Sequence, residues 1–176
     1  MKYAPYLLEQ GVKVIDIGGE FRLKDAEIYR TWYGNEHTCP ELLEQAVYGL
    51  CEISREQVQD AQLCSNPGCY PTASILGLHP FVRELGESVT GINISASSGV
   101  SGAGRTAMST GGNLFVNCFN SHMAYKAGTH KHTPEIEQAL QTGVTFIPQL
   151  ASIDRGILTV SYINCAGTLP SQKDAE

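Results

Sequence analysis

The chain has 176 residues, of which 42% are hydrophobic and 17% charged, and its formal net charge is -6. This length suffices for one domain or for parts of two. The negative charge argues against non-specific nucleic-acid binding, which needs a basic surface. No stretch approaches the ~20 apolar residues of a membrane-spanning helix, and the N-terminus has no apolar signal core, so we expect a cytoplasmic protein.

Apolar periodicity and turn residues predict helices and strands that alternate along the chain. In chain order, the predicted elements are a helix at 3–10, a strand at 12–17, helices at 25–33 and 40–45, a strand at 46–50, a helix at 54–60, a strand at 61–65, a helix at 70–85, strands at 89–96 and 114–119, a helix at 133–141, and strands at 144–150 and 157–164. Ser54 is expected to cap the helix that follows it, and Pro71 lies in the first turn of the longest helix, where proline is tolerated. This order predicts a mixed α/β fold. The chain opens on a helix that feeds a strand and closes on a polar tail, so we expect a fragment of a longer enzyme.

The six cysteines do not form a metal or redox motif. No C-x-x-C pair is present, which argues against a zinc ribbon or a thioredoxin-like site. Cys118 and His122 with His130 and His132 give C-x3-H and H-x-H, but no rigid element supplies paired ligands at common zinc spacings, so we expect no metal. Most of the cysteines are therefore expected to be small buried side chains in a reducing compartment.

Cys69 stands apart because of its place in the segment 65–72, Ser-Asn-Pro-Gly-Cys-Tyr-Pro-Thr. It follows a glycine and opens a helix whose first turn contains a proline. A sulfur there faces backbone N–H groups and the positive end of the helix dipole, and both favour a thiolate. The sequence pattern alone leaves two interpretations open, a nucleophile or a buried cysteine in a helix cap.

The same segment resembles the active-site signature of the N-acetyl-γ-glutamyl-phosphate reductases, a family related to aspartate-semialdehyde dehydrogenases and, more distantly, to glyceraldehyde-3-phosphate dehydrogenases. The resemblance implies that Cys69 is the nucleophile. It implies that residues 1–65 form the C-terminal part of a Rossmann-type dinucleotide-binding domain, truncated at its start. Residues 66–176 would then form a mixed-sheet catalytic and dimerisation domain like that of glyceraldehyde-3-phosphate dehydrogenase, truncated at its end.

Two further segments agree with this resemblance in order along the chain. Gly18-Gly19-Glu20-Phe21-Arg22-Leu23 follows a predicted strand, and Arg22 there could bind a carboxylate or phosphate through a forked contact, or form a surface ion pair. Ser98-Gly99-Val100-Ser101-Gly102-Ala103-Gly104-Arg105 could present backbone N–H groups to an anion, with a positive charge from Arg105, or be a plain connector. The resemblance implies substrate contacts for Arg22 and Arg105. It implies cofactor contacts for Ser98, Gly99, Ser101, Gly102 and Gly104.

A third segment, Gly128-Thr129-His130-Lys131-His132-Thr133-Pro134-Glu135, carries a pair of histidines. An extended backbone would place His130 and His132 on one face, and a histidine there could act as an acid or base near neutral pH. Glu135 could orient one of them, while the alternative is a pair of solvent-facing histidines at a helix start. The resemblance implies a catalytic histidine in this segment. We favour His132 as the acid or base, with His130 close behind it as a second catalytic candidate or as a ligand of the substrate or its phosphate. Glu135 is expected among the substrate-binding residues.

The resemblance implies NADP as cofactor, an acyl phosphate as substrate, and a homodimer or homotetramer assembled through the sheet of the catalytic domain. The expected reaction is reduction of N-acetyl-glutamyl 5-phosphate to the semialdehyde through a cysteine thioester. Three alternatives stay open: a reductase of an aspartyl or aminoadipyl phosphate, a Cys-His hydrolase that needs no cofactor loop, and an inactive module kept for dimerisation.

Overall fold

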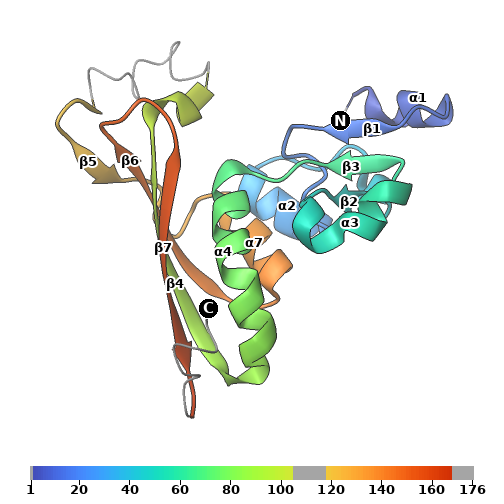
Figure 1. Ribbon diagram of the computed structural model, residues 1–176. Coiled ribbons are helices and arrows are strands. Elements are labelled where there is room, and N and C mark those ends of the chain that lie inside the picture. The colour runs from blue at the N-terminus through green and yellow to red at the C-terminus, as the bar shows by residue number, and fades with distance from the viewer. Residues whose placement is uncertain (1, 105–117, 168–176) are drawn as a thin grey trace. The chain divides into compact units, whose positions relative to one another are not determined.

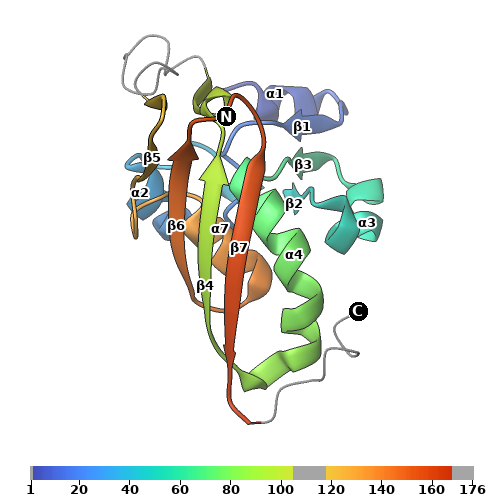
Figure 2. The ribbon, with the colours of Figure 1, turned by 60° about the vertical axis from the view of Figure 1, so that its left-hand side comes forward.

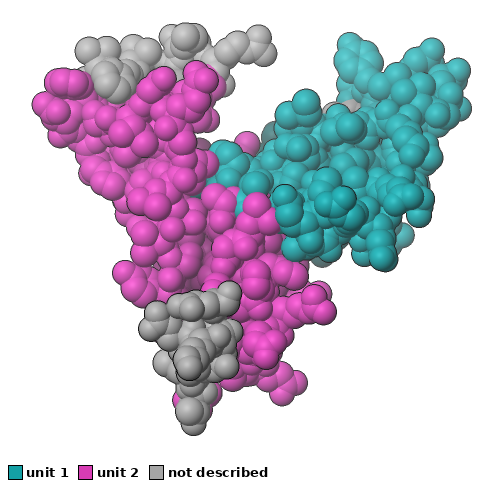
Figure 3. Space-filling model, in the orientation of Figure 1, with its two compact units in different colours: residues 1–72 teal, residues 73–176 magenta. Residues whose placement is uncertain are grey.

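The computed structural model describes residues 2–104 and 118–167, whose helices and strands are shown in Figure 1. The chain divides into two compact units, Met1–Thr72 and Ala73–Glu176 (Figure 3). Among the described residues, no helix has the length and apolar character needed to cross a membrane. The interleaving of helices and strands confirms the predicted mixed α/β class.

The first unit is built on a small parallel sheet. Its elements are α1 (Ala4–Glu9), β1 (Val14–Asp16), α2 (Ala26–Tyr33), the 3-10 helix η1 (Pro40–Leu42), β2 (Val47–Tyr48), α3 (Cys51–Asp60) and β3 (Leu63–Ser65). The strand order is β1-β3-β2, and both neighbours run parallel to β3. Parallel strands require crossover connections, which α2 and α3 help to supply (Figure 1). β3 is therefore the central strand, and the chain leaves its carboxyl end toward Cys69.

Local sequence explains where α2 begins and ends. Asp25 caps the helix, because its Oδ1 accepts hydrogen bonds from the backbone N–H groups of Glu27 and Ile28 at 2.7 and 3.0 Å. Gly34 ends the helix in the left-handed conformation with φ of 75°, which glycine adopts without a steric penalty. The predicted helix over 25–33 is confirmed at both of its ends.

The prediction that Ser54 caps α3 is wrong. The helix begins three residues earlier, at Cys51, and Ser54 interrupts it with φ of -133° and ψ of 31°. Its hydroxyl lies 2.6 Å from the Tyr48 carbonyl and 2.9 Å from the Leu50 carbonyl, to which it can donate. The Ser54 hydroxyl therefore binds the chain that enters the helix, and the helix is kinked at this residue.

The second unit is a four-stranded mixed sheet covered on one face by helices. Its elements are the greater part of α4 (Cys69–Leu85), the 3-10 helices η2 (Gly86–Ser88) and η3 (Val100–Ala103), β4 (Val89–Ser98), β5 (His122–Ala124), α7 (Thr133–Leu140), β6 (Val144–Ala151) and β7 (Ile157–Cys165). The order is β5-β6-β4-β7, with β4 and β6 parallel and the outer strands antiparallel to their neighbours. Figure 2 shows β6, β4 and β7 side by side with α4 and α7 behind them.

Alternation along the strands separates a buried face from an open one. The buried apolar side chains of these strands and helices include Ile75, Leu78, Ile92, Ile94, Ala96, Ile136, Leu140, Phe146 and Leu150. They come from β4, β6, α4 and α7, so the helices cover the apolar face of the sheet. The predicted strand at 114–119 is not present at Cys118 and Phe119, and its first four residues lie outside the described part of the chain. β5 was not predicted.

A buried histidine belongs to this core. His130 is 7% exposed, and its ring lies edge-on to Phe146 with 5.5 Å between ring centroids. Its Nδ1 accepts a hydrogen bond of 3.1 Å from the backbone N–H of His132, which requires an unprotonated nitrogen. Burial, reinforced by the charges of Lys126 and Lys131, lowers the pKa of His130 to about 4. The imidazole is therefore neutral at pH 7.

This histidine should make stability depend on pH. Its folded pKa of about 4 lies below the ordinary 6.5, so the unfolded chain binds more protons between these values. The contribution of the neutral His130 to the free energy of unfolding is fully present above pH 6.5 and decreases as the pH falls toward 4. The loss at pH 5 is on the order of 1 kcal/mol, allowing for solvent screening near the ring. His130→Asn keeps a comparable acceptor without titrating, so urea unfolding at pH 7.5 and 5 should show a smaller loss in this variant. An equal loss in both proteins would contradict this account.

Candidate active site

Cys69 lies where the central parallel strand passes into α4. Its environment is built by a short turn in which Asn66 donates its backbone N–H to the Asp16 carbonyl at 2.8 Å. The Gly68 carbonyl accepts 2.9 Å hydrogen bonds from both the backbone N–H and the hydroxyl of Thr72, which closes the first turn of α4. Cys69 is the first residue of this 17-residue helix and is exposed. The turn thus presents a thiol at a helix N-terminus, a position that favours an anion.

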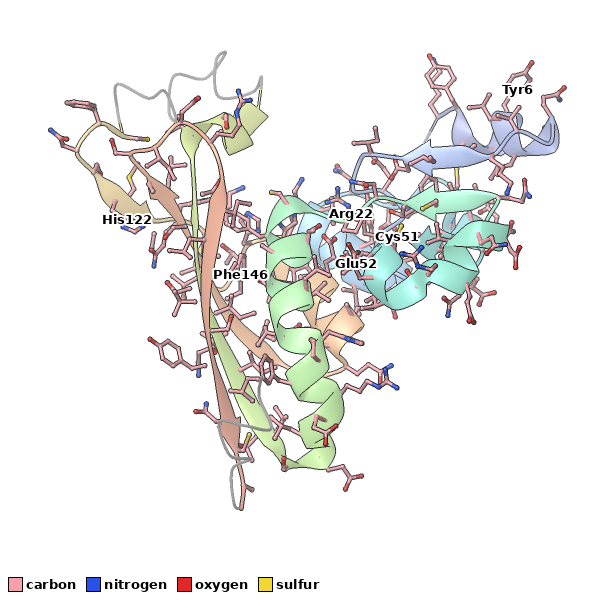
Figure 4. All side chains as sticks on the ribbon, viewed as in Figure 1. Tyr6, Arg22, Cys51, Glu52, His122 and Phe146 are labelled. Atoms are coloured by element: carbon pink, nitrogen blue, oxygen red, sulfur yellow. The ribbon has the colours of Figure 1, made fainter. Side chains whose placement is uncertain are left out.

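Arg22 lies beside this turn (Figure 4). Its Nε donates to the carbonyl of Asn66 at 2.8 Å, and its Nη2 approaches the carbonyl of Ile17 at 3.4 Å. These carbonyls follow β3 and β1, so the side chain bridges the carboxyl ends of two neighbouring strands. The structure thus brings Arg22 and Cys69, both predicted as site residues, to the same end of the parallel sheet. It shows Arg22 bonded to backbone carbonyls, while its predicted contact with substrate stays a prediction.

A second cysteine occupies an equivalent position in another helix. Cys51 is the first residue of α3 and is also exposed, but Glu52 follows it in the first turn, where α4 has no acidic residue. Burial and the neighbouring Cys51 raise the pKa of the Cys64 thiol. Cys39 and Cys118 are buried. Cys51 therefore differs from Cys69 in local charge while sharing its place in a helix and its exposure.

Two other groups with shifted pKa values in the first unit have structural explanations. Lys24 donates to the carbonyls of Leu43, Glu44 and Ala46, and burial lowers its pKa despite the opposing charge of Glu44. Burial, together with the nearby Glu20 and Asp16 charges, raises the pKa of Tyr29. We find no catalytic geometry around either group.

The second unit brings His130, His132 and Glu135 together at the start of α7. The rings of His130 and His132 lie 4.7 Å apart, centroid to centroid, in an edge-on arrangement. The expectation that an extended backbone aligns them is wrong, because His132 is helical in φ and ψ and the Thr133 N–H donates to the His130 carbonyl. Glu135 is 1% exposed in the first turn of the helix. Neither histidine faces solvent as the alternative interpretation required, since both are 7% exposed.

The backbone of the Gly/Ser loop after β4 is hydrogen-bonded to the segment between β6 and β7. The N–H groups of Gly99, Val100 and Ser101 donate to the carbonyls of Gly156, Ile153 and Asp154, respectively, at 2.9 to 3.1 Å. The expectation that these amides form a ready anion site is wrong, because they already have acceptors within the chain.

Two glycines of this loop are nevertheless required by its geometry. A Cβ on Gly99 would lie 2.7 Å from the backbone of Arg155 and Asp154, and Gly104 has φ of 61°. Ser98, which ends β4, is 5% exposed and lies next to this loop. The predicted Arg105 lies outside the described residues.

The sequence analysis missed a polar network on the open face of the sheet. The Ser97 hydroxyl lies 2.9 Å from Nε2 of His122 on β5 and 3.1 Å from the side-chain oxygen of Gln149. The amide nitrogen of Gln149 donates to the Ser95 hydroxyl at 2.8 Å. Alternating polar residues along 93–97 were the available signal. Among the described residues, no cluster of three metal-ligating side chains is present, and the prediction of no metal site stays a prediction.

Comparison with known families agrees with this two-part architecture. Residues 69–175 match the sequence model of the semialdehyde dehydrogenase dimerisation domain, and residues 1–61 match that of the semialdehyde dehydrogenase NAD binding domain. Similar solved structures include aspartate semialdehyde dehydrogenase II from Vibrio cholerae, with a TM-score of 0.67 and 17% identity over 96% of this chain and 53% of that one. A probable aspartate-semialdehyde dehydrogenase from Pseudomonas aeruginosa gives a TM-score of 0.63 and 19% identity over 99% of this chain and 54% of the other. These similarities show the fold.

Curated relatives are more similar in sequence. The N-acetyl-gamma-glutamyl-phosphate reductase of Dehalococcoides mccartyi strain 195 is 48% identical over 90% of this chain and 48% of its own length. The reductases of the same name from Geobacillus kaustophilus and Nitrosospira multiformis are 48% and 43% identical, and cover 92% and 93% of this chain. The chain spans about half the length of these relatives. Since one family model covers more than half of it and a second matches most of the remainder, the chain belongs to the semialdehyde dehydrogenase family.

Proposed function

We propose that this chain carries the nucleophile of an N-acetyl-γ-glutamyl-phosphate reductase, which reduces N-acetyl-glutamyl 5-phosphate to N-acetyl-glutamate 5-semialdehyde in arginine biosynthesis. The activity belongs to a protein of the relatives' full length that contains these residues. The observation that carries the proposal is the exposed Cys69 at the start of α4, in a turn bonded to neighbouring strands. The identity to reductases of this name supports the choice of substrate.

The proposed reaction begins when the Cys69 thiolate attacks the acyl carbon. The C–O bond to phosphate breaks, inorganic phosphate leaves, and a thioester forms on Cys69. The cofactor NADPH, when bound, supplies hydride to the thioester carbonyl. The oxyanion that forms takes a proton from an acid to give a thiohemiacetal. The same group then removes this proton as the C–S bond breaks, so that the aldehyde is released and Cys69 leaves as thiolate. Residues that stabilise the oxyanion and move this proton are therefore required.

His132 is our candidate for the proton transfer. His130 is less suited, because its Nδ1 accepts the His132 backbone N–H and its pKa of about 4 leaves the ring neutral at pH 7, where its remaining N–H is only weakly acidic. We assign His130 to holding the His132 backbone and to a substrate contact through its other nitrogen. The buried Glu135 would orient His132 or balance its charge. Arg22 and Arg105 are proposed to bind the anionic groups of the substrate.

The parallel sheet of the first unit supports the proposal that this unit binds a dinucleotide. The parallel strands β1, β3 and β2 end at one edge, and dinucleotides bind outside the carboxyl ends of such strands. We propose that residues 1–65 belong to the NADP-binding domain and that residues 66–176 form the catalytic and dimerisation domain. Ser98 at the end of β4 and the loop residues Gly99, Ser101, Gly102 and Gly104 would contact the nicotinamide half of the cofactor.

The free cysteines agree with a cytoplasmic location, which we also propose.

Replacing the nucleophile should separate chemistry from cofactor binding. Cys69→Ser in the full-length enzyme should lower kcat for NADPH-dependent reduction by at least about a thousandfold, because a serine hydroxyl is a far weaker nucleophile than a thiolate. The Kd for NADPH, measured by fluorescence titration, should change less than about twofold. Cys51→Ser is the matched control and should retain activity. Loss of both activity and NADPH affinity in Cys69→Ser would assign the cysteine a structural role.

We further propose that a second copy of the protein covers the open face of the sheet, in a homodimer or homotetramer. Figure 1 shows α4 and α7 on the same side of β4, β6 and β7. The other side exposes Leu158, Val160 and Tyr162 of β7, at 66%, 45% and 65%. Contiguous exposed apolar side chains mark interaction surfaces, and the matching family model is that of a dimerisation domain.

A charge placed on this face should dissociate the assembly. Val160→Lys would bury an unpaired ammonium between two copies, which raises the dissociation constant by at least about tenfold. Sedimentation velocity over a concentration series measures this change. Ile28→Lys on α2 is the matched control, because Ile28 is 44% exposed and lies in the other unit. Equal dissociation in both variants, or none in Val160→Lys, would argue against this interface.

A further inference from the structure

We propose that Arg22 is a positioning residue for Cys69, and that its guanidinium fixes the turn from which the nucleophile projects. This role is separate from any contact that Arg22 makes with substrate. It rests on the function proposed above for Cys69. The contacts that carry it all lie within the first unit.

The Arg22 side chain is enclosed by the protein. It is 8% exposed, and its neighbours Phe21 and Leu23 are in the core at 2% and 1%. A buried guanidinium requires acceptors, since an unsatisfied charge is costly to bury. Nε finds one in the Asn66 carbonyl and Nη2 approaches another in the Ile17 carbonyl. The planar group is therefore oriented by the ends of two strands.

The turn beside it is bonded from several directions. Asn66 donates its N–H to Asp16 and its side-chain amide to the Pro67 carbonyl at 3.1 Å. Pro67 has no N–H to anchor the next peptide. The bond from Arg22 to the Asn66 carbonyl thus restrains the peptide that joins Asn66 to Pro67. Because α4 begins two residues later, rotation of this peptide would displace the Cys69 thiol.

Lysine cannot replace arginine in this role. Its ammonium is a single point of charge at the end of a flexible chain, and it has no donor at the position of Nε. A lysine would keep the positive charge that attracts an anionic substrate. The two roles of Arg22 therefore respond differently when the reagent is neutral and no substrate is present.

The experiment measures alkylation of individual cysteines by iodoacetamide at fixed pH, read by peptide mass spectrometry. Wild type, Arg22→Lys and Arg22→Ala are compared without substrate or cofactor. We expect the rate at Cys69 to fall roughly tenfold or more in Arg22→Lys, because iodoacetamide reacts with the thiolate and the displaced sulfur leaves the backbone N–H groups at the start of α4. The rate at Cys51 should stay within about twofold of wild type. Ethylguanidinium at millimolar concentration should restore Cys69 labelling in Arg22→Ala.

Each other outcome overturns the inference. An unchanged Cys69 rate in Arg22→Lys would leave Arg22 as a substrate ligand alone. New labelling at the buried Cys39 would show that the whole unit opens, so that Arg22 is a general stabilising residue. If Arg22→Ala does not fold, the alkylation rates at Cys69 and Cys51 in Arg22→Lys test the inference by themselves. If Cys69 in the wild type reacts no faster than Cys51, the assignment of Cys69 as nucleophile fails first, and this inference fails with it.

Discussion

The peptide between Asn66 and Pro67 is the constraint on which the surroundings of Cys69 depend. Arg22 donates to its carbonyl, and the N–H of the preceding peptide, that of Asn66, donates to the Asp16 carbonyl of β1. Beyond it, the Gly68 carbonyl closes the first turn of α4. These hydrogen bonds hold the backbone on both sides of Cys69, at the residue where α4 begins.

The second unit follows the same principle with different groups. The His130 ring is placed in the core against Phe146, and its Nδ1 fixes the backbone at which α7 begins. His132 and the buried Glu135 then occupy defined places in the first turn. The loop after β4 is held by hydrogen bonds from the N–H groups of Gly99, Val100 and Ser101 to carbonyls of residues 153–156. In each unit a proposed site residue lies at a helix start, and a buried side chain is hydrogen-bonded to the backbone beside it.

The sequence predicted the regular elements well, because they depend on local patterns. Alternation along β4, β6 and β7 and the capping residues around α2 identified these elements close to their observed bounds. The contact of Arg22 with Asn66 could not be predicted, since it joins residues 44 apart through a backbone carbonyl. Ser54 was misjudged because a serine hydroxyl can either accept from a following N–H or donate to a preceding carbonyl. β5 is three residues long and all three are exposed, so it has no apolar alternation to detect.

The most direct test of the central claim is a search for the covalent intermediate on Cys69. The full-length enzyme is mixed with N-acetyl-glutamyl 5-phosphate without NADPH, phosphate release is followed by stopped flow, and the quenched protein is mapped by peptide mass spectrometry. We predict a burst of about one phosphate per active site and an acyl adduct on the peptide that contains Cys69. Absence of a burst together with an unmodified Cys69, or an adduct on another residue, would contradict the account.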